Sequence, residues 1–196
     1  MTAYVTLDEL KDALGVEHAN EDSRFAAALN AASRAVDDFC GRVFTTDTAA
    51  TARQFQPHSG SLCLVDDFYT TSGLVVKTDD DDDGTFETTW AAADYLLQPL
   101  NGRRGAQTWP YTEIHTLIPR SFPRTAHPAV EVTAKWGWTT PPEPVKYATR
   151  LLAMAAWKRK DAPFGVAGFD TFGVVRVRDD PDVARALGPY RLGRVG

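Results

Sequence analysis

Apolar residues recur at helical spacing at both ends of the chain and at strand spacing in the middle. Close to the N-terminus, the leucines of residues 7–14 fall on one helical face. Thr6 and Glu9 have the spacing of a capping box, and Gly15 follows as a helix stop. The pattern therefore predicts a short, well-capped helix over residues 7–14.

A second apolar stripe begins near Asp22 and continues to Cys40. Apolar residues recur three and four positions apart along it, and alanine fills many of the other positions. Gly41 follows directly and is expected to end the helix. Because small side chains allow close approach, this helix is expected to pack tightly against other helices.

From Arg42 to Trp138 the apolar period changes to that of strands. Short strands are predicted at residues 62–65, 74–77, 86–90, 95–98, 113–117 and 130–136. Turn clusters separate them, among them Ser72-Gly73 and Asp83-Gly84. Several short strands between turns are typical of a small antiparallel sandwich or barrel.

The chain returns to helical spacing after this region. Thr140, Pro141 and Glu143 are placed as an N-cap, a first helical residue and the far side of a capping box. The helix they begin is expected to continue to about Lys160. A last short helix is expected at residues 181–187.

These elements predict an α+β protein with a small helical bundle, an inserted antiparallel β domain and an extended C-terminal arm. The bundle combines the two N-terminal helices with the long C-terminal helix. The expected boundaries are 1–41 and 140–160 for the helical core, 42–139 for the β-rich insertion and 161–196 for the arm. With 196 residues, of which 43% are hydrophobic and 24% charged, the chain is long enough for a sizeable core.

The arm is unusual because phenylalanine and glycine alternate in it. The phenylalanines are Phe164, Phe169 and Phe172, and the glycines are Gly165, Gly168 and Gly173. Glycines at this density oppose a helix, yet the segment is too aromatic for a solvated linker. The arm is therefore expected to lie on its own core, on a sister subunit or on another protein.

The net charge of −5 is unevenly distributed, because residues 145–196 carry ten Lys and Arg against five Asp and Glu. An acidic body with a basic end argues against a protein that coats DNA with a basic face. The basic end is expected to dock on an acidic partner or on the acidic body of a neighbouring subunit, or else to serve solubility alone.

No apolar run reaches the roughly 18 residues of a membrane span, and residues 1–6 lack the basic and apolar parts of a signal peptide. Cys40 and Cys63 form no disulfide framework and have no metal-ligand spacing. Synthesis in a reducing host cytoplasm, away from membranes, is the simplest expectation.

An acidic run at Asp79 to Gly84 is the one motif that suggests a ligand. Asp79, Asp81 and Asp83 match the first half of a calcium-binding EF-hand loop, but Trp90 stands where its last glutamate belongs. The tip of a hairpin explains the run equally well. No metal site is predicted here, although weak divalent binding stays open.

Other catalytic signatures are missing from the sequence. The four histidines lie in separate segments without ligand-pair spacing. There is no Gly-rich phosphate loop and no Gly-x-Ser-x-Gly elbow. We therefore predict no catalytic residue, no cofactor and no enzyme activity.

Three segments together resemble the head-to-tail connector (head–tail adaptor) proteins of long-tailed bacteriophages. They are the opening YVTLDELK at residues 4–11 with Leu14-Gly15, the helix end AASRAVDDFCGR at residues 31–42, and PPEPVK at 141–146 leading into AAWKRKDAPFG at 155–165. The resemblance covers both helical ends and the order of the parts.

The resemblance implies a structural virion protein located in the neck, where about twelve subunits form a ring joined head-to-tail beneath the portal. Its implied partners are the portal protein, sister subunits and tail-side neck proteins, and genomic DNA would pass through the channel without specific binding. An acidic body suits such a channel because like charges prevent tight phosphate contacts. A tail-completion or neck protein on the tail side remains an alternative, as does a calcium- or carbohydrate-binding module.

The portal or subunit interface is expected at the end of the long C-terminal helix and in the arm. Its candidate residues are aromatic or basic: Trp157, Arg159, Phe164, Phe169, Phe172, Arg176 and Arg178. An aromatic residue among cations suits an interface anchor. Cations at a helix C-terminus also favour the helix dipole, which needs no partner.

Overall fold

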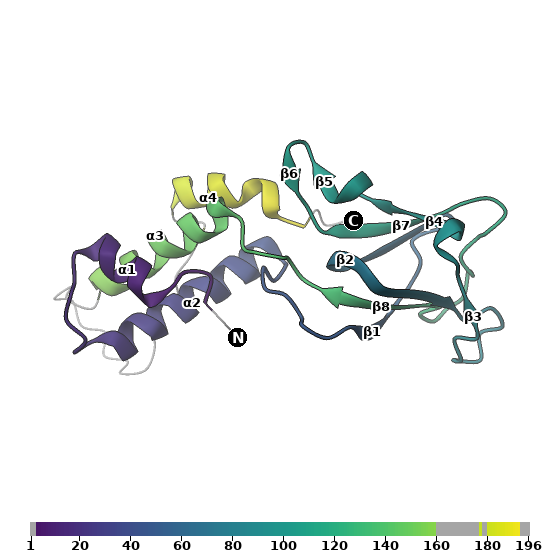
Figure 1. Cartoon of the computed structure of the whole chain (residues 1–196), viewed down its shortest axis with the longest axis horizontal. Coiled ribbons are helices and arrows are strands. Elements are labelled where there is room, and N and C mark those ends of the chain that lie inside the picture. The colour runs from purple at the N-terminus through teal and green to yellow at the C-terminus, as the bar shows by residue number, and fades with distance from the viewer. Residues whose placement is uncertain (1–2, 160–176, 178–179, 193–196) are drawn as a thin grey trace. The chain divides into compact units, whose positions relative to one another are not determined.

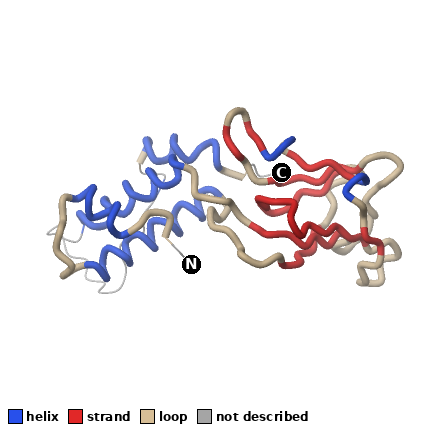
Figure 2. The backbone as a smooth tube through the Cα atoms, viewed as in Figure 1, coloured by secondary structure: helices blue, strands red, loops and turns tan. Residues whose placement is uncertain are grey.

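A computed structural model describes residues 3–159, 177 and 180–192 of the chain. Its α-helices come before and after the stretch of sequence that forms the antiparallel sheet, which confirms the expected α+β class. Figure 2 shows the helices in blue and the strands in red. The chain divides into two compact units. The helical unit combines Met1–Thr45 with Thr140–Gly196, and the sheet unit is Thr46–Thr139.

The helical unit contains α1 (Leu7–Leu14), α2 (Asp22–Cys40), α3 (Glu143–Arg159), α4 (Pro181–Leu187) and the 3₁₀ turn η4 (Gly188–Tyr190) (Figure 1). α2 contacts α1 and α3, and α3 also contacts α1 and α4. None of the helices in the described part of the chain has the length and apolar character needed to cross a membrane.

Local signals determine where α1 begins and where α1 and α2 end. The Thr6 hydroxyl accepts the Glu9 N–H at 3.2 Å, and the Glu9 carboxylate accepts the Thr6 N–H at 2.7 Å, so the predicted capping box forms. Gly15 and Gly41 end the two helices, each with a φ of 67°. Both helices have the bounds that the sequence predicted, because these signals act within a few residues.

The start of α3 differs from the expectation. The helix begins at Glu143, and the Pro142 carbonyl accepts the Lys146 N–H at 3.0 Å. Glu143 bonds the Lys146 ammonium at 2.8 Å instead of closing a capping box. Thr140 and Pro141 thus precede the helix, since a proline at 142 disfavours the helical conformation for the residue before it.

The described part of the expected C-terminal arm is folded into the helical unit. Val183, Leu187 and Tyr190 are buried, and the Leu192 N–H donates to the Cys40 carbonyl at 2.8 Å. The prediction of a short helix at residues 181–187 is therefore confirmed by α4, whereas the prediction of an extended arm is wrong for residues 180–192. Their apolar side chains complete the core beside α3, which α4 contacts.

The sheet unit contains eight strands joined by turns and loops. They are β1 (Thr51–Phe55), β2 (Leu62–Thr78), β3 (Thr88–Thr89), β4 (Tyr95–Gln98), β5 (Arg103–Arg104), β6 (Gln107–Thr108), β7 (Tyr111–Thr116) and β8 (Val130–Trp136), with 3₁₀ turns η1 (Ala92–Asp94) and η2 (Leu100–Gly102). The main sheet has the order β1-β8-β2-β7-β4, with β3 beside β2, while β5 and β6 form a separate hairpin. All pairings are antiparallel.

The long strand β2 replaces the two strands expected at residues 62–65 and 74–77. Its first part pairs with β7 and its later part with β8, and the register shifts between these parts. Ser72-Gly73, expected as a turn, lies inside the strand, where Gly73 has a φ of 81°. Glycine allows a strand to bend without ending, so the turn signal was misleading.

Other strands match the expectation to different degrees. β4 and β8 have the predicted bounds, and β7 begins two residues earlier than predicted and ends one residue earlier. The strand predicted at 86–90 shortens to β3. β1 and the β5–β6 hairpin were not predicted.

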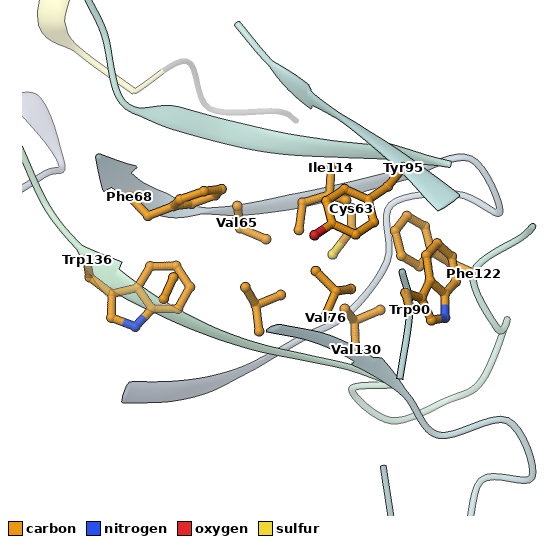
Figure 3. Close-up of a cluster of buried hydrophobic side chains, with 12 residues drawn as sticks. Cys63, Val65, Phe68, Val76, Trp90, Tyr95, Ile114, Phe122, Val130 and Trp136 are labelled. Carbon is orange, nitrogen blue, oxygen red and sulfur yellow. The ribbon is translucent and has the colours of Figure 1, made fainter. Parts of the chain in front are cut away.

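β2 pairs with β7 through its first part and with β8 through its later part, and the core of the sheet unit lies between these strands (Figure 3). Phe68 and Trp136 meet edge-to-face at one end, with ring centroids 6.1 Å apart. Trp90 stacks on Phe122 at the other end, at 4.8 Å. Aliphatic side chains of β2, β7 and β8 fill the space between them, as Figure 3 shows. Trp136 is 2% exposed and is among the largest side chains of this core.

Candidate functional site

Trp157, the first of the predicted interface residues, lies near the end of α3. Its ring stacks on Phe25 of α2, with centroids 3.9 Å apart and an angle of 29° between the planes. Phe25 is fully buried, whereas Trp157 is half-buried. One side of the indole therefore belongs to the helical core. The proposed contact with a partner remains a prediction for the part that is accessible.

The other predicted interface residues follow Trp157 in the sequence. Arg159 is the last residue of α3. Phe164, Phe169, Phe172, Arg176 and Arg178 lie outside the described residues. Their role in attachment therefore stays a prediction from the sequence.

The acidic loop between β2 and β3 is organised around one buried carboxylate. The Asp79 side chain accepts backbone N–H groups from Asp82 at 2.8 Å, Asp83 at 3.3 Å and Gly84 at 2.8 Å. Asp79 is only 3% exposed, unlike the acidic residues that follow it. Its negative charge is offset by amide dipoles of its own loop, which explains how it can be buried.

Four carboxylates converge at this loop. Asp79, Asp81, Asp83 and Glu87 each place an oxygen so that all four atoms lie within 4.8 Å of one another. Repulsion by Asp83 is the main cause that raises the pKa of Asp81 above its usual value. Oxygen ligands of this kind suit a hard cation such as Ca²⁺. The loop is nevertheless already closed by its own hydrogen bonds, and three of its four carboxylates are exposed.

Sequence reasoning singled out the aspartates of this loop but did not include Glu87. Glu87 comes back to the loop because its carboxylate accepts the Asp80 N–H at 3.0 Å, and the Thr88 hydroxyl donates to Asp80 at 2.7 Å. The spacing of eight residues between Asp79 and Glu87 was the available signal. This spacing does not by itself bring Glu87 to the loop, because only the conformation of the turn places its carboxylate beside Asp80.

The two cysteines are buried, and two of the four histidines pair with carboxylates. Burial raises the pKa of the Cys40 and Cys63 thiols to about 12, so neither is a ready nucleophile. His115 pairs with Glu113 at 2.8 Å on β7, and His127 lies 3.4 Å from Asp82. His115 and His127 thus pair with different carboxylates and do not belong to one site.

Similarity to known proteins was found at the level of fold. No protein-family model matches the chain, and no curated protein matches it. Among solved structures, a chain from the neck of an empty gene transfer agent particle, computed with C6 symmetry, aligns with a TM-score of 0.55 and 20% identity. This alignment covers 100% of this chain and 95% of the other.

Two further structures give the same picture. A chain from the neck of the native particle, computed with C12 symmetry, has a TM-score of 0.53 and 18% identity over 97% of this chain and 90% of the other. A chain from the virion of the native gene transfer agent has a TM-score of 0.52 and 20% identity over 98% and 92%. These alignments show a fold shared along essentially the whole chain.

Proposed function

We propose that this protein is a structural, non-enzymatic component of the neck of a phage-like particle. In this role it forms a ring beneath the portal, extends the DNA channel and provides a docking surface for the tail. The observation that carries the proposal is the fold shared over the full chain with proteins whose structures are of gene transfer agent necks. The resemblance of residues 4–11 with 14–15, 31–42, 141–146 and 155–165 to phage connectors supports it independently of the structure.

A ring assembly is the expected quaternary state of this protein. The related neck structures were computed with sixfold and twelvefold symmetry, which supports a homo-oligomeric ring for this fold. In such a ring each copy uses two different surfaces for its two neighbours. Sister subunits, the portal protein and tail-side neck proteins are therefore the proposed partners.

The charge of the chain agrees with a channel for DNA. Its net charge of −5 disfavours tight binding of phosphates, so DNA would move past the ring without specific contacts. The buried thiols and separately paired histidines described above also offer no assembled catalytic centre. We therefore expect a virion protein without turnover.

The proposal is tested by deleting the gene from the genome that encodes it and examining the particles. We expect DNA-filled heads without tails, and full recovery when the intact chain is supplied in trans. Mass spectrometry of purified particles should find the chain in the particle. Normal tailed particles after the deletion, or particles that lack the chain altogether, would reject the role.

A tail-side neck or tail-completion protein is the alternative from the same particle. The two roles predict that the protein stays with different parts of the particle when heads and tails are separated. Heads that retain the chain when tails are lost support the connector role. Isolated tails that retain it would instead assign the protein to the tail side.

A further inference from the structure

The sheet unit has two outward faces of different character. On β8, Glu131, Thr133 and Lys135 alternate with buried residues and face away from the core. Lys77 of β2 lies opposite Glu131, with 3.7 Å between the ammonium and the carboxylate. This face is therefore polar, as expected for a sheet surface in contact with water.

The outward face of β2, β7 and β4 is less polar, because leucines of β2 and β4 lie on it beside His115 of β7. Cys63, Ile114 and Tyr95 point into the core, as Figure 3 shows, so their neighbours along each strand point outward. Leu62 and Leu96 lie on either side of His115 in the register of the three strands. Leucine side chains thus flank β7 on this face.

The same pattern continues along the strands. Leu64 lies opposite Glu113, and Leu117 follows β7 two residues after His115, which places it on the same side. We call the outward set of Leu62, Leu64, Leu96 and Leu117 the leucine face. Leu96 is 45% exposed and Leu117 is 37% exposed, and the neighbouring Ile118 is 97% exposed. A grouped apolar surface of this kind marks an interaction site more often than scattered apolar residues do.

The polar groups of the leucine face are compatible with burial. Glu113 and His115 bond each other at 2.8 Å, so a partner covering them would not leave either side chain without a hydrogen bond. β4 is also the last strand on this side of the main sheet. A partner can therefore reach both the face and the strand edge beside it.

We propose that the leucine face is the lateral contact with a second copy of this chain. The inference rests on the proposed ring, in which each copy needs a surface for its neighbour. Copies that each carry a net charge of −5 gain no attraction from their overall charge, so a contact between them needs apolar area besides any local ion pairs. The leucine face supplies that contact, while the face with Lys77 and Lys135 does not.

Site-specific photo-cross-linking in assembled particles tests this contact. A benzophenone amino acid is placed at Leu96 on the leucine face or, as the matched control, at Thr133 on the polar face. We expect Leu96 to give adducts between two copies of this chain, identified by mass spectrometry, at a yield several times that of Thr133. Adducts mainly with another virion protein, or equal yields at the two positions, would overturn the inference.

Charge substitutions give a second, independent measurement. Leu96→Asp with Leu117→Asp should abolish assembly into particles, while the circular dichroism spectrum stays the same and the melting temperature falls only slightly, because Leu96 is 45% exposed and Leu117 is 37% exposed. Thr133→Asp should assemble normally. Normal assembly of the double variant would reject the contact. If particles never contain the wild-type chain, the proposed function itself has failed, which is a different result from a wrong cross-linking partner.

Discussion

At the scale of single residues, Tyr4 ties the start of the chain to the end of α2. Its hydroxyl donates to the Asp37 carboxylate and accepts the Phe44 N–H at 2.9 Å. The Arg34 guanidinium lies 5.8 Å from the ring centroid and pairs with Asp37 at 2.9 Å. Burial, and then the bond to Asp37, raise the pKa of the Tyr4 phenol well above its usual value.

The Tyr4 network predicts a loss of stability at alkaline pH. Between the ordinary pKa of tyrosine, about 10, and the raised value, the folded chain holds a proton that the unfolded chain releases, so the free energy of unfolding falls as pH rises. Tyr4→Phe should cost about 1–3 kcal/mol at neutral pH through its lost hydrogen bonds, and should weaken this alkaline decline. Urea unfolding at several pH values measures both effects. An unchanged pH profile in the variant would show that Tyr4 does not cause the decline.

Substitutions of Asp79 and Asp81 should change the stability differently, although both residues belong to the same acidic run. Asp79→Ala removes the acceptor of three backbone N–H groups and should destabilise the sheet unit by about 1–3 kcal/mol. Asp81→Ala removes an exposed side chain repelled by its neighbours and should be neutral or slightly stabilising. Thermal unfolding of the two variants provides the comparison.

Adding calcium to the same thermal unfolding experiment tests whether the acidic loop binds a metal ion. If the loop serves only to close the hairpin, calcium and EDTA should give equal melting temperatures for the wild-type chain. A large calcium-dependent rise that Asp81→Ala removes would show that the converging carboxylates bind the ion.

At the scale of elements, the sequence predicts best where the signal is local. The capping box of Thr6 and Glu9 and the glycines after α1 and α2 act within one turn of helix, and these helices were predicted to the residue. β1 has no comparable local signal. It is fixed by pairing with β8, where Thr51 lies opposite Ala134. Such a partner, about eighty residues away, cannot be identified from periodicity.

The candidate site shows the same division between local and distant information. The acidic run was visible in the sequence, but the burial of Asp79 was not, because it depends on the conformation of the loop that follows. The leucine face was also missed. Leu62 and Leu96 belong to strands that were expected, yet only the register places both beside His115.

Trp157 tests whether the end of α3 is core or contact surface. Its stacking on Phe25 predicts that Trp157→Ala destabilises the helical unit by about 3 kcal/mol, with Trp157→Phe as a milder control. Chemical denaturation measures the change. An alanine variant with wild-type stability that fails to assemble would identify Trp157 as an interface anchor rather than a core residue.

At the scale of the whole molecule, the sheet unit is an insertion between two parts of the helical unit, and its first and last residues lie close together. The Asp47 N–H donates to the Trp136 carbonyl at 2.9 Å, and Thr46 forms a bridge with Gly137. The Trp138 indole also donates to the Asp67 carboxylate at 2.7 Å. The first two contacts join the two ends of the insertion, and the third holds its last residues to β2, so the unit can fold around its own core.

Attachment to the particle is predicted to depend on the phenylalanines of the arm and not on α4. Changing Phe164, Phe169 and Phe172 to serine keeps the length of the chain and the buried side chains of α4. We expect little change in melting temperature but no incorporation into particles, because burying three phenylalanine side chains against a partner would contribute roughly 5–9 kcal/mol before ordering costs. Complementation of connector-deficient particles, with circular dichroism as the folding control, measures both outcomes.

Leu187→Ala supplies the contrast for this experiment. Leu187 is fully buried in the helical unit, so its truncation should destabilise the fold by about 2–5 kcal/mol. Any loss of assembly in this variant would then follow from reduced folding. If the triple serine variant instead unfolds as readily as Leu187→Ala, the arm completes the protein's own core. Attachment would then have to use another surface of the chain.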